Sequence, residues 1–403
     1  MAKRVFFLTQ FFHPEPAATA QLLTELAVEL VKRGIEVTVY TSQPTYYERQ
    51  RLPRQEEFHG VRIVRLFSTR FNKKKLFGRL ANGITFCLAV LLRLLTASDG
   101  APLLIVSAPP FLGWVGWLVS LVRRRKYVFL IHDVYPDVAI QLGYMKKSGI
   151  TARIWEMLNR RVYDHASTVI VLGERMRQVV EQRIENSATP VEVIHNWADG
   201  QFIVPRSKEE NWFAQKYGLV GKTVVLYSGN MGLFHDLETI IEAADRLQGL
   251  EDLVFLFIGG GGKKEKLVQM AKQRGLKNVK FLPYQPRDHL PYSLTAGDIG
   301  VVTLERGVEG FCVPSKLYSY LAAGQAILAL VGKDSEVADI IEKFECGIRI
   351  DQGDIEGVVN ALARWRNDLS LLERMKRNAR NCFEQHFTKD QAIARYHEIL
   401  KRL

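Results

Sequence analysis

Short runs of β-branched and aromatic residues alternate with segments of helical periodicity along nearly the whole chain. This alternation is typical of βαβ units built around a parallel sheet. The chain has 403 residues, which is too long for one hydrophobic core, since cores stop growing at roughly 250–300 residues. The sequence therefore predicts an α/β protein with two doubly wound domains that face each other across a cleft at the carboxyl ends of their strands.

A break in this alternation sets the expected domain boundary. The pattern lapses in a polar stretch around Pro205 and restarts at Thr223. We expect an N-terminal domain over 1–200, a linker over 201–222, a second domain over 223–385 and a terminal helix over 386–403. The expected strands are Val5–Phe11, Val37–Thr41, Val61–Leu66, Leu103–Ser107, Tyr127–His132, Thr168–Leu172 and Val191–His195, then Thr223–Ser228, Leu253–Ile258, Val279–Leu282, Ile299–Thr303 and Ala326–Leu330.

Almost all of the net charge of +12 lies at the front of the chain, where residues 1–130 hold 19 Lys and Arg against 8 Asp and Glu. The densest cationic runs are Arg70–Lys75, before the apolar stretch Leu76–Leu95, and Arg123–Lys126, after the apolar stretch Pro102–Val122. Cations beside apolar surface favour docking on an anionic membrane. Nucleic acid is not an expected partner, because no zinc finger, aromatic RNA-binding motif or basic helix with heptads occurs.

Both apolar stretches are expected to be buried elements of a soluble domain. Pro109 and Pro110 interrupt the second stretch, and the first contains Asn82 and Arg93. The start, Met1–Leu8, lacks the long apolar region of a signal peptide. We therefore expect a cytoplasmic protein that is peripheral on the inner face of the plasma membrane.

The cysteines indicate the same compartment. The chain has four, and they form no C-x-x-C pair, so neither a disulfide framework nor a zinc ribbon is expected. A reducing compartment fits this pattern.

Two glycine-rich turns follow consecutive strands of the second domain. Leu226–Gly232 has two glycines three apart, and Phe257–Gly262 has four in a row, followed by Lys263 and Lys264. Glycines let backbone amides approach a phosphate, and the N-terminus of the next helix favours an anion. Such turns also occur only to close a tight strand-to-helix connection. Two in consecutive units, one of them with cations, favour phosphate binding.

The segment Glu309–Gly324 joins an acidic, glycine-containing loop to a short helix. Pro314 and Ser315 suit the first helical positions, so the amides that follow and the ammonium of Lys316 could meet a diphosphate together. The alternative is a surface loop with a solvated lysine.

This segment resembles the E-G-F-G-x-P…E-A-M-A-A-G signature of the retaining glycosyltransferases of family 4, which have the GT-B fold of two Rossmann-like domains. The resemblance extends over the whole chain. Other segments similar to family motifs are Ser228–Gly232 (Y-S-G-N-x-G), Val193–Asp199 (V-I-P-N-x-x-D), Ala296–Asp298 (A-x-D) and His132–Asp137 (H-D-x-x-P-D, of members that work on lipid-linked sugars). The final helices, ending Arg395–Glu398, are similar to the segment that crosses back to the first domain.

The resemblance implies a set of site residues. The implied catalytic residues are His132, Glu309 and Lys316. The implied donor-binding residues are Gly229, Asn230, Gly232, Gly260, Tyr284, Phe311, Cys312, Val313, Ser315, Leu317 and Ser319. The implied acceptor-side residues are His13, Glu15 and Asp133.

The sequence departs from the family pattern at several of these positions. Asn230 and His235 stand where the family has an Arg and a Lys, so phosphate binding is expected to pass to Lys316. Ser319 replaces the second Glu of the signature, which in the family binds the ribose hydroxyls. Glu309 takes the first-Glu position if Ser315 and Lys316 are a two-residue insertion. Proline and alanine replace the family's glycines after His13.

No D-x-D motif occurs in the chain, and we expect neither a metal nor a cofactor. Helix amides and Lys316 would then stabilise the departing diphosphate. For a retaining transfer the resemblance implies front-face attack, in which a donor phosphate oxygen accepts the acceptor's proton and no protein nucleophile is needed.

The expected function is transfer of a hexose from a UDP-sugar, with UDP-glucose favoured, to a lipid-linked or growing polysaccharide acceptor. A nucleotide-sugar epimerase or phosphorylase of the same shape is one alternative, since fold does not fix function. The basic, apolar front domain disfavours it. A non-catalytic membrane scaffold is the other, which the changes at Asn230 and Ser319 leave open.

Overall fold

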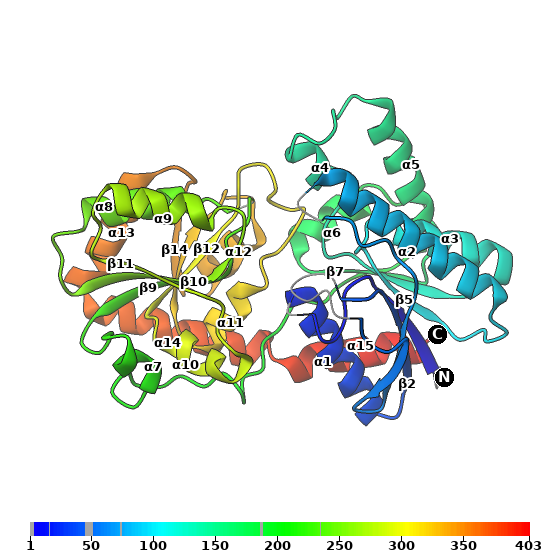
Figure 1. The fold of residues 1–403 in the computed structure, drawn as a ribbon, viewed down its shortest axis with the longest axis horizontal. Coiled ribbons are helices and arrows are strands. Elements are labelled where there is room, and N and C mark those ends of the chain that lie inside the picture. The colour runs from blue at the N-terminus through cyan, green and yellow to red at the C-terminus, as the bar shows by residue number, and fades with distance from the viewer. Residues whose placement is uncertain (1–3, 16, 45–50, 73–74, 186–187, 234) are drawn as a thin grey trace. The chain divides into compact units, whose positions relative to one another are not determined.

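The computed structural model describes residues 4–15, 17–44, 51–72, 75–185, 188–233 and 235–403. The chain divides into two compact units, each built on its own sheet with helices on both faces (Figure 1). Unit 1 comprises Met1–His195 and Ala392–Leu403, and unit 2 comprises Asn196–Gln391. The prediction of two α/β domains is confirmed.

Unit 1 has an eight-stranded sheet in the order β3-β4-β2-β1-β5-β6-β7-β8. The central strands are continuous apolar runs and fully buried, as a parallel sheet covered on both faces requires. The strands are β1 (Arg4–Leu8), β2 (Glu36–Thr41), β3 (Gln55–Phe58), β4 (Val61–Arg65), β5 (Leu103–Val106), β6 (Tyr127–Leu130), β7 (Thr168–Val171) and β8 (Val191–Val193). The helices are α1 (Ala18–Lys32), α2 (Leu76–Thr96), α3 (Leu112–Arg123), α4 (Asp137–Gln141), α5 (Ile150–His165) and α6 (Glu174–Glu181).

Unit 2 has a six-stranded parallel sheet in the order β11-β10-β9-β12-β13-β14. The strands are β9 (Thr223–Asn230), β10 (Leu253–Gly260), β11 (Val279–Leu282), β12 (Ile299–Thr303), β13 (Ala326–Leu330) and β14 (Gly347–Ile350). The helices are α7 (Trp212–Lys216), α8 (Glu238–Arg246), α9 (Lys264–Gln273), the 3-10 turn η1 (Arg287–His289), α10 (Leu290–Thr295), α11 (Lys316–Ala322), α12 (Glu336–Lys343), α13 (Ile355–Asn367) and α14 (Leu369–His386). A last helix, α15 (Lys389–Lys401), begins in unit 2 and continues into unit 1. Strand β9 lies between β10 and β12, so its carboxyl end is central to the unit.

Two strands were not expected from the sequence. Strand β3 reads Gln-Glu-Glu-Phe and pairs antiparallel with β4 at the sheet edge. Its polar residues suit an edge strand but give no apolar periodicity. Strand β14 has four residues and pairs with β13.

The structure corrects the expected linker. Residues 201–222 belong to unit 2 and include α7. The side chain of Asn211 caps α7 and donates hydrogen bonds to the carbonyl of Tyr292 (2.8 Å) and to Thr295 Oγ1 (3.0 Å) of α10. The polar composition of the segment therefore reflects a cap and turns within unit 2, and the boundary lies at His195 instead of residue 200.

The last helix divides between the two units. Helix α15 begins at Lys389, and its residues from Ala392 onward belong to unit 1. Lys389 pairs with Asp199 within unit 2 (2.6 Å), whereas Arg395 pairs with Glu192 within unit 1 (2.7 Å). Tyr396 is buried.

The expectation that both apolar stretches are buried is corrected for α2 and for the end of α3. Only 39% of the most apolar window of α2 is buried, and one face of α2 carries exposed side chains. By length and composition alone α2 could cross a membrane, but core helices of soluble proteins meet the same criteria.

Candidate active site

The ends of β9 and β10 form the centre of the candidate donor site in unit 2. The two strands run side by side to their last residues, with Gly259 opposite Gly229 and Gly260 opposite Asn230. A Cβ on Gly259 would lie 2.0 Å from the carbonyl oxygen of Gly229, which excludes a side chain. The glycines of the second turn are therefore needed for this close approach, whether or not they also meet a phosphate.

Lys316 reaches this turn from the first position of α11. Its Nζ lies 3.8 Å from the ring centroid of Tyr227 and donates a hydrogen bond to the hydroxyl of that residue (2.5 Å). A Cβ on Gly229 would have the Lys316 Cε as its nearest neighbour, at 4.0 Å. The lysine therefore lies directly beside the glycine turn, and the alternative of a solvated surface lysine does not fit.

The charge state of Lys316 is set by its surroundings. Within the described residues no carboxylate forms an ion pair with it, and burial lowers its pKa to about 7. Its positive charge also contributes to lowering the pKa of His235, for which burial is the larger cause. An ammonium that is poorly compensated in this way gains most from an anion that arrives with the substrate.

Two tyrosine hydroxyls hold the turn in place. Tyr227 donates to the carbonyl of Asn230 (2.6 Å), and the amide of Ser228 donates to the hydroxyl of Tyr320 (2.7 Å). The sequence did not identify these two tyrosines as supports of the turn, although Tyr227 directly precedes the Ser-Gly-Asn motif. Only the parallel register and the packing of α11 bring them to the turn.

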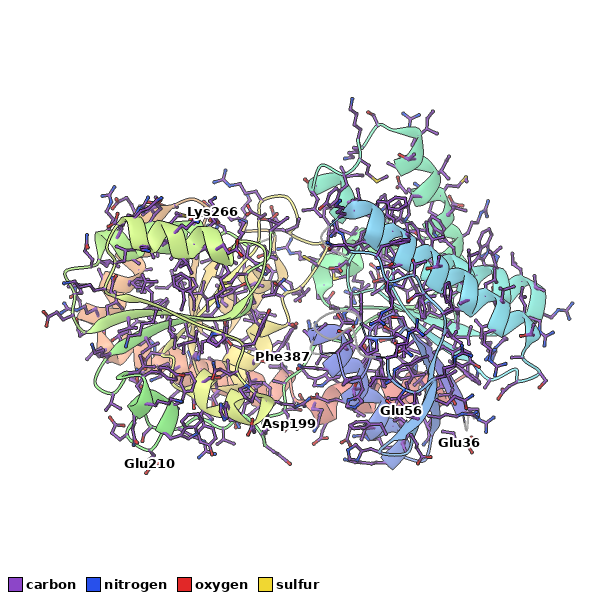
Figure 2. All side chains as sticks on the ribbon, viewed as in Figure 1. Glu36, Glu56, Asp199, Glu210, Lys266 and Phe387 are labelled. Atoms are coloured by element: carbon purple, nitrogen blue, oxygen red, sulfur yellow. The ribbon has the colours of Figure 1, made fainter. Side chains whose placement is uncertain are left out.

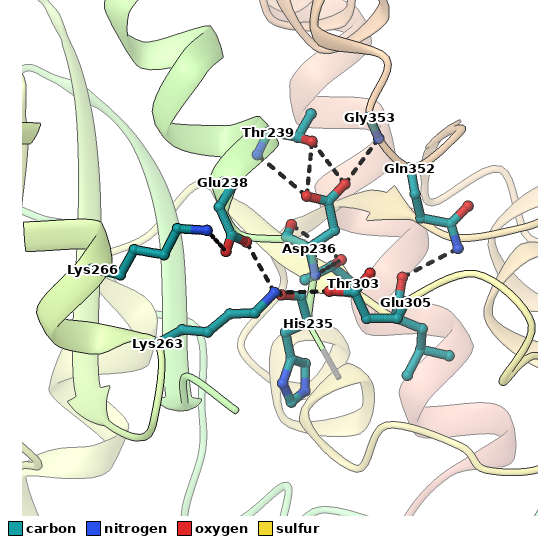
Figure 3. A network of polar contacts seen from close by, with 11 residues as sticks. His235, Asp236, Glu238, Thr239, Lys263, Lys266, Thr303, Glu305, Gln352 and Gly353 are labelled. Carbon is teal, nitrogen blue, oxygen red and sulfur yellow. Dashed lines mark hydrogen bonds and ion pairs between the residues drawn. The ribbon is translucent and has the colours of Figure 1, made fainter. Parts of the chain in front are cut away.

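Both lysines of the second glycine turn already have partners within unit 2, as Figure 3 shows for Lys263. Lys263 pairs with Glu238 (3.0 Å) and Glu305 (2.8 Å) and donates to the carbonyl of His235 (2.7 Å). Lys264 donates to the carbonyls of Gly259 and Leu282. The inference that these two lysines favour a phosphate is corrected, because they serve to join the loops of unit 2.

The remaining residues at this end of the sheet surround the turn. Asn230 is exposed, and its amide nitrogen would lie 2.8 Å from a Cβ on Gly232. Tyr284, after β11, has 43% of its surface exposed and lies over Gly260, whose carbonyl accepts a hydrogen bond from its hydroxyl (3.4 Å).

Glu309 has a structural role in this arrangement. One carboxylate oxygen accepts from the amide of Gly307 (2.6 Å), and the other accepts from the amide of Gly332 (3.1 Å) and from Gln352 Nε2 (2.7 Å). The carboxylate thus fixes its own loop to the ends of β13 and β14. A catalytic role for Glu309 stays a prediction.

The rest of the signature loop leads into α11. Phe311 and Cys312 are half-buried and Val313 is buried; Ser315 and Ser319 are half-buried, before and within α11. The side chain of Leu317 lies in the core, and its amide donates to the carbonyl of Pro314 (3.2 Å). The side chain and the amide of Leu317 are thus both engaged within their own unit.

In unit 1, His132 and Asp133 follow β6. The amide of His132 donates to Ser107 Oγ at the end of β5 (2.9 Å), which ties two neighbouring strand ends together. His132 Nε2 has no hydrogen-bond partner among the described residues. Burial lowers the pKa of the imidazole to about 4 and raises the pKa of the Asp133 carboxyl to about 6. The imidazole is thus neutral at pH 7, with one nitrogen available to a ligand.

The loop after β1 holds the other predicted acceptor-side residues. The ring of His13 stacks on Phe58 of β3, with 3.8 Å between centroids, and its carbonyl accepts from Arg65 (3.1 Å). Arg65 also forms an ion pair with Glu56 (2.5 Å). Glu56 is labelled in Figure 2. Glu15 is buried. The unexpected strand β3 therefore gives His13 a packing role.

Sequence reasoning missed the groups that support the His132 loop. Asp137 forms a bidentate ion pair with Arg183 (2.7 and 2.8 Å), and Tyr135 stacks on Trp155. Asn159 donates to the carbonyl of Tyr135 (2.7 Å). Asp137 is part of the H-D-x-x-P-D motif, but its partner lies 46 residues away, where the sequence gives no signal.

In the part of the chain that the structure describes, potential metal ligands do not gather at this site. Among the described residues no group of three or more His, Cys, Asp or Glu is placed to hold a metal ion.

A cavity of about 560 Å³ lies in unit 1, lined by residues that include Phe6, Tyr40 and Arg93. It is separate from the strand ends that carry His132, so it does not belong to the candidate site.

Two domain families match nearly the whole chain. Residues 208–382 match the family described as glycosyl transferases group 1, and residues 18–197 match the glycosyl transferase 4-like domain. This chain belongs to the family 4 type glycosyltransferases. The motif-based expectation of the family is confirmed.

Relatives and solved structures agree with this assignment. The glycosyltransferase is 27% identical over 402 residues to WcaI of Escherichia coli, named as a colanic acid biosynthesis glycosyl transferase, with 96% of each chain covered. It is 29% identical over 248 residues to WbjE of Pseudomonas aeruginosa, named as a glycosyltransferase; this match covers 62% of the chain and 60% of the relative.

The fold of the glycosyltransferase is that of GT-B enzymes. Sucrose-phosphate synthase of Thermosynechococcus elongatus matches with a TM-score of 0.78 at 16% identity, over 99% of this chain and 98% of that one. Anabaena HepE, solved with UDP-glucose, matches with a TM-score of 0.73 at 18% identity, over 99% of this chain and 100% of that one. The GT-B expectation is confirmed.

Proposed function

We propose that this glycosyltransferase moves a hexose from a UDP-sugar, of the UDP-glucose type, to a lipid-linked or growing polysaccharide acceptor. The transfer retains the configuration of the sugar and uses no metal. The enzyme acts in the cytoplasm, peripheral on the inner face of the plasma membrane.

The position of Lys316 carries this proposal. Its ammonium lies on the ring of Tyr227 beside the Gly229 turn, and no described carboxylate compensates it. The donor diphosphate would supply the missing negative charge through a charge-assisted contact. Lys263 and Lys264 cannot do this in their present contacts, because Lys263 is paired with two glutamates and Lys264 is bound to two carbonyls.

Other features support the donor and acceptor classes. The exposed ring of Tyr284 offers a stacking surface for a base, and Ser319, on α11, offers a hydroxyl to the ribose. HepE was solved with UDP-glucose, and WcaI is named for polysaccharide biosynthesis. The basic, apolar front of the chain suits an acceptor at a membrane.

The reaction needs no protein nucleophile. The acceptor oxygen forms the new bond to the sugar's anomeric carbon on the face that the diphosphate leaves. The bond from this carbon to the phosphate oxygen breaks, UDP keeps the electron pair, and the acceptor's proton passes to a donor phosphate oxygen. Lys316 and helix amides stabilise the charge on the leaving group. His132, neutral at pH 7, would hydrogen-bond the donor sugar.

Metal independence has a direct test. Lys316 would take the place of a divalent ion at the diphosphate, so transfer should continue at an unchanged rate in excess EDTA. Loss of activity in EDTA that returns on adding Mg²⁺ or Mn²⁺ would contradict this part of the proposal.

The function itself is tested with radiolabelled UDP-glucose and a membrane extract. We expect label in the lipid or glycan fraction, and the Lys316→Ala variant as control should give at least tenfold less label at a low concentration of UDP-glucose. A freely interconverted sugar would indicate an epimerase. Absence of any product, together with absence of UDP binding, would indicate a scaffold.

A further inference from the structure

Helix α2 presents a continuous apolar face to solvent. Its exposed large side chains are Leu76 (41%), Phe77 (75%), Leu80 (37%), Ile84 (47%), Leu88 (55%) and Leu92 (65%). Spacings of three and four residues place them on one side of the helix. From Phe77 to Leu92 the face extends for about 22 Å at 1.5 Å per residue. An uncovered apolar face of this length indicates an interaction surface.

The opposite face fixes α2 in unit 1. Phe86, Val90 and Leu94 are fully buried. Asn82 accepts a hydrogen bond from the amide of Phe71 (2.9 Å) and donates one to its carbonyl (3.0 Å). These contacts hold the helix to its own unit, so it cannot leave to span a membrane.

The apolar face continues onto α3, which packs beside α2 (Figure 1). Leu118, Leu121 and Val122 of α3 are exposed by 41%, 52% and 67%. Both helices connect successive parallel strands by crossovers to the same side of the sheet, and so both turn their outer faces away from it.

Cations lie at both ends of this surface. Lys75 is exposed at the N-terminal end of α2, and Arg123 and Arg124 are exposed at the end of α3. The guanidinium of Arg123 donates to the carbonyl of Ala97, next to the end of α2 (2.6 Å). Neither helix contains an acidic residue. Arg125, in contrast, is buried and bonded to the carbonyl of Ala101, which removes it from the cationic run expected to meet lipid; Lys73 and Lys74 lie outside the described residues.

We propose that α2 and the adjoining end of α3 dock flat on an anionic bilayer, with the α2 face inserted at the depth of the headgroups. In-plane helices of this kind bury one apolar face by about 5–10 Å and bind headgroups through flanking cations. This inference rests on the proposed function only in assuming that the acceptor is at the membrane. Binding to lipid can be measured without any sugar transfer.

The charges disfavour a second copy of the chain as the occupant. A two-fold interface pairs the same surface on both copies. Antiparallel α2 helices would then place Lys75 of one copy near Arg123 and Arg124 of the other, with no acidic residue on α2 or α3 between them.

The test is co-sedimentation of the full chain with vesicles of phosphatidylglycerol and phosphatidylcholine, and of phosphatidylcholine alone. The triple variant Ile84→Gln, Leu88→Gln, Leu92→Gln should bind the anionic vesicles at least tenfold more weakly than the parent. A matched triple in unit 2, Val220→Gln, Val268→Gln, Leu369→Gln, should bind as the parent does. Lys75→Glu with Arg124→Glu should abolish the salt dependence of binding.

Each other outcome overturns the proposal. Parental binding by the α2 variant would place the docking surface elsewhere. A parent that binds neither vesicle would exclude lipid, and a parental dimer that the α2 variant converts to a monomer in light scattering would make a second copy the occupant. A circular dichroism spectrum and a melting temperature equal to those of the parent show that the α2 variant is folded, and transfer to a soluble acceptor tests the proposed function separately.

Discussion

The two units of this chain use apolar and charged residues in opposite ways. In unit 2, the buried Tyr227 and Tyr320 hold the turn of the site, and Lys263 is neutralised by carboxylates from other loops. In unit 1, most of the chain's strongly exposed apolar side chains lie between Phe67 and Met157, in the half that also holds the excess positive charge. A site for a small charged ligand needs fixed, desolvated groups, whereas a surface for an extended partner needs exposed ones.

The largest expected effect tests whether unit 1 also takes part in the chemistry. His132→Ala should lower the rate of sugar transfer about 100-fold, the scale expected when a reacting group loses its alignment. UDP affinity should not change. Initial rates and isothermal titration would be compared with those of His165→Ala, an exposed histidine at the end of α5. Equal rates for the two variants would contradict a role of His132 in the reaction and would leave unit 1 with a role in docking alone.

Removal of the cation in unit 2 should weaken nucleotide binding itself. Lys316→Ala should cost roughly 1.5–3 kcal/mol of UDP affinity, the value of one charge-assisted hydrogen bond. Titration calorimetry with UDP measures the loss, and Lys266→Ala, an exposed lysine of the same unit, is the control. Parental affinity in Lys316→Ala would remove the main support for the proposed site.

The pH dependence of UDP binding sharpens the same point. Because burial lowers the pKa of Lys316 to about 7, the free enzyme loses this charge as pH rises through 7. A bound diphosphate raises that pKa, so binding takes up a proton and weakens with rising pH, by about fivefold between pH 7 and 8. Lys316→Arg keeps its charge and should show no such change. A parent with pH-independent affinity in this range would contradict the assignment.

The smallest expected effect concerns the support of that lysine. Tyr227→Phe removes the hydroxyl that joins Lys316 to the carbonyl of Asn230 and should cost about 0.5–1.5 kcal/mol in UDP affinity. Tyr292→Phe, whose ring lies on α10, is the matched control. A loss in the control as large as in Tyr227→Phe would assign the effect to general stability.

Much of the fold could be predicted because buried parallel strands are continuous apolar runs. Strand β3 escaped because its Gln-Glu-Glu-Phe sequence is stabilised by its partner β4 and not by its own periodicity. The linker was misplaced because the anchoring of Asn211 to Tyr292 joins residues 81 positions apart.

The candidate site shows the same limit. Local motifs located the glycine turns and Lys316, since chemistry and backbone geometry restrict those positions. They could not show that Glu238 and Glu305 neutralise Lys263, because the glutamates lie 25 and 42 residues away along the chain. Nor could they show which face of α2 is uncovered, since that depends on what the rest of unit 1 covers.

The division of α15 between the units has a consequence for biosynthesis. Unit 2 is one continuous segment, whereas unit 1 receives Ala392–Leu403 only after all of unit 2 has been synthesised. Until then, the surfaces that bury Ile393, Tyr396 and Leu400 are open on the nascent chain. Domains emerging from the ribosome usually fold in N- to C-terminal order. Here the first unit to begin folding is the last to be completed.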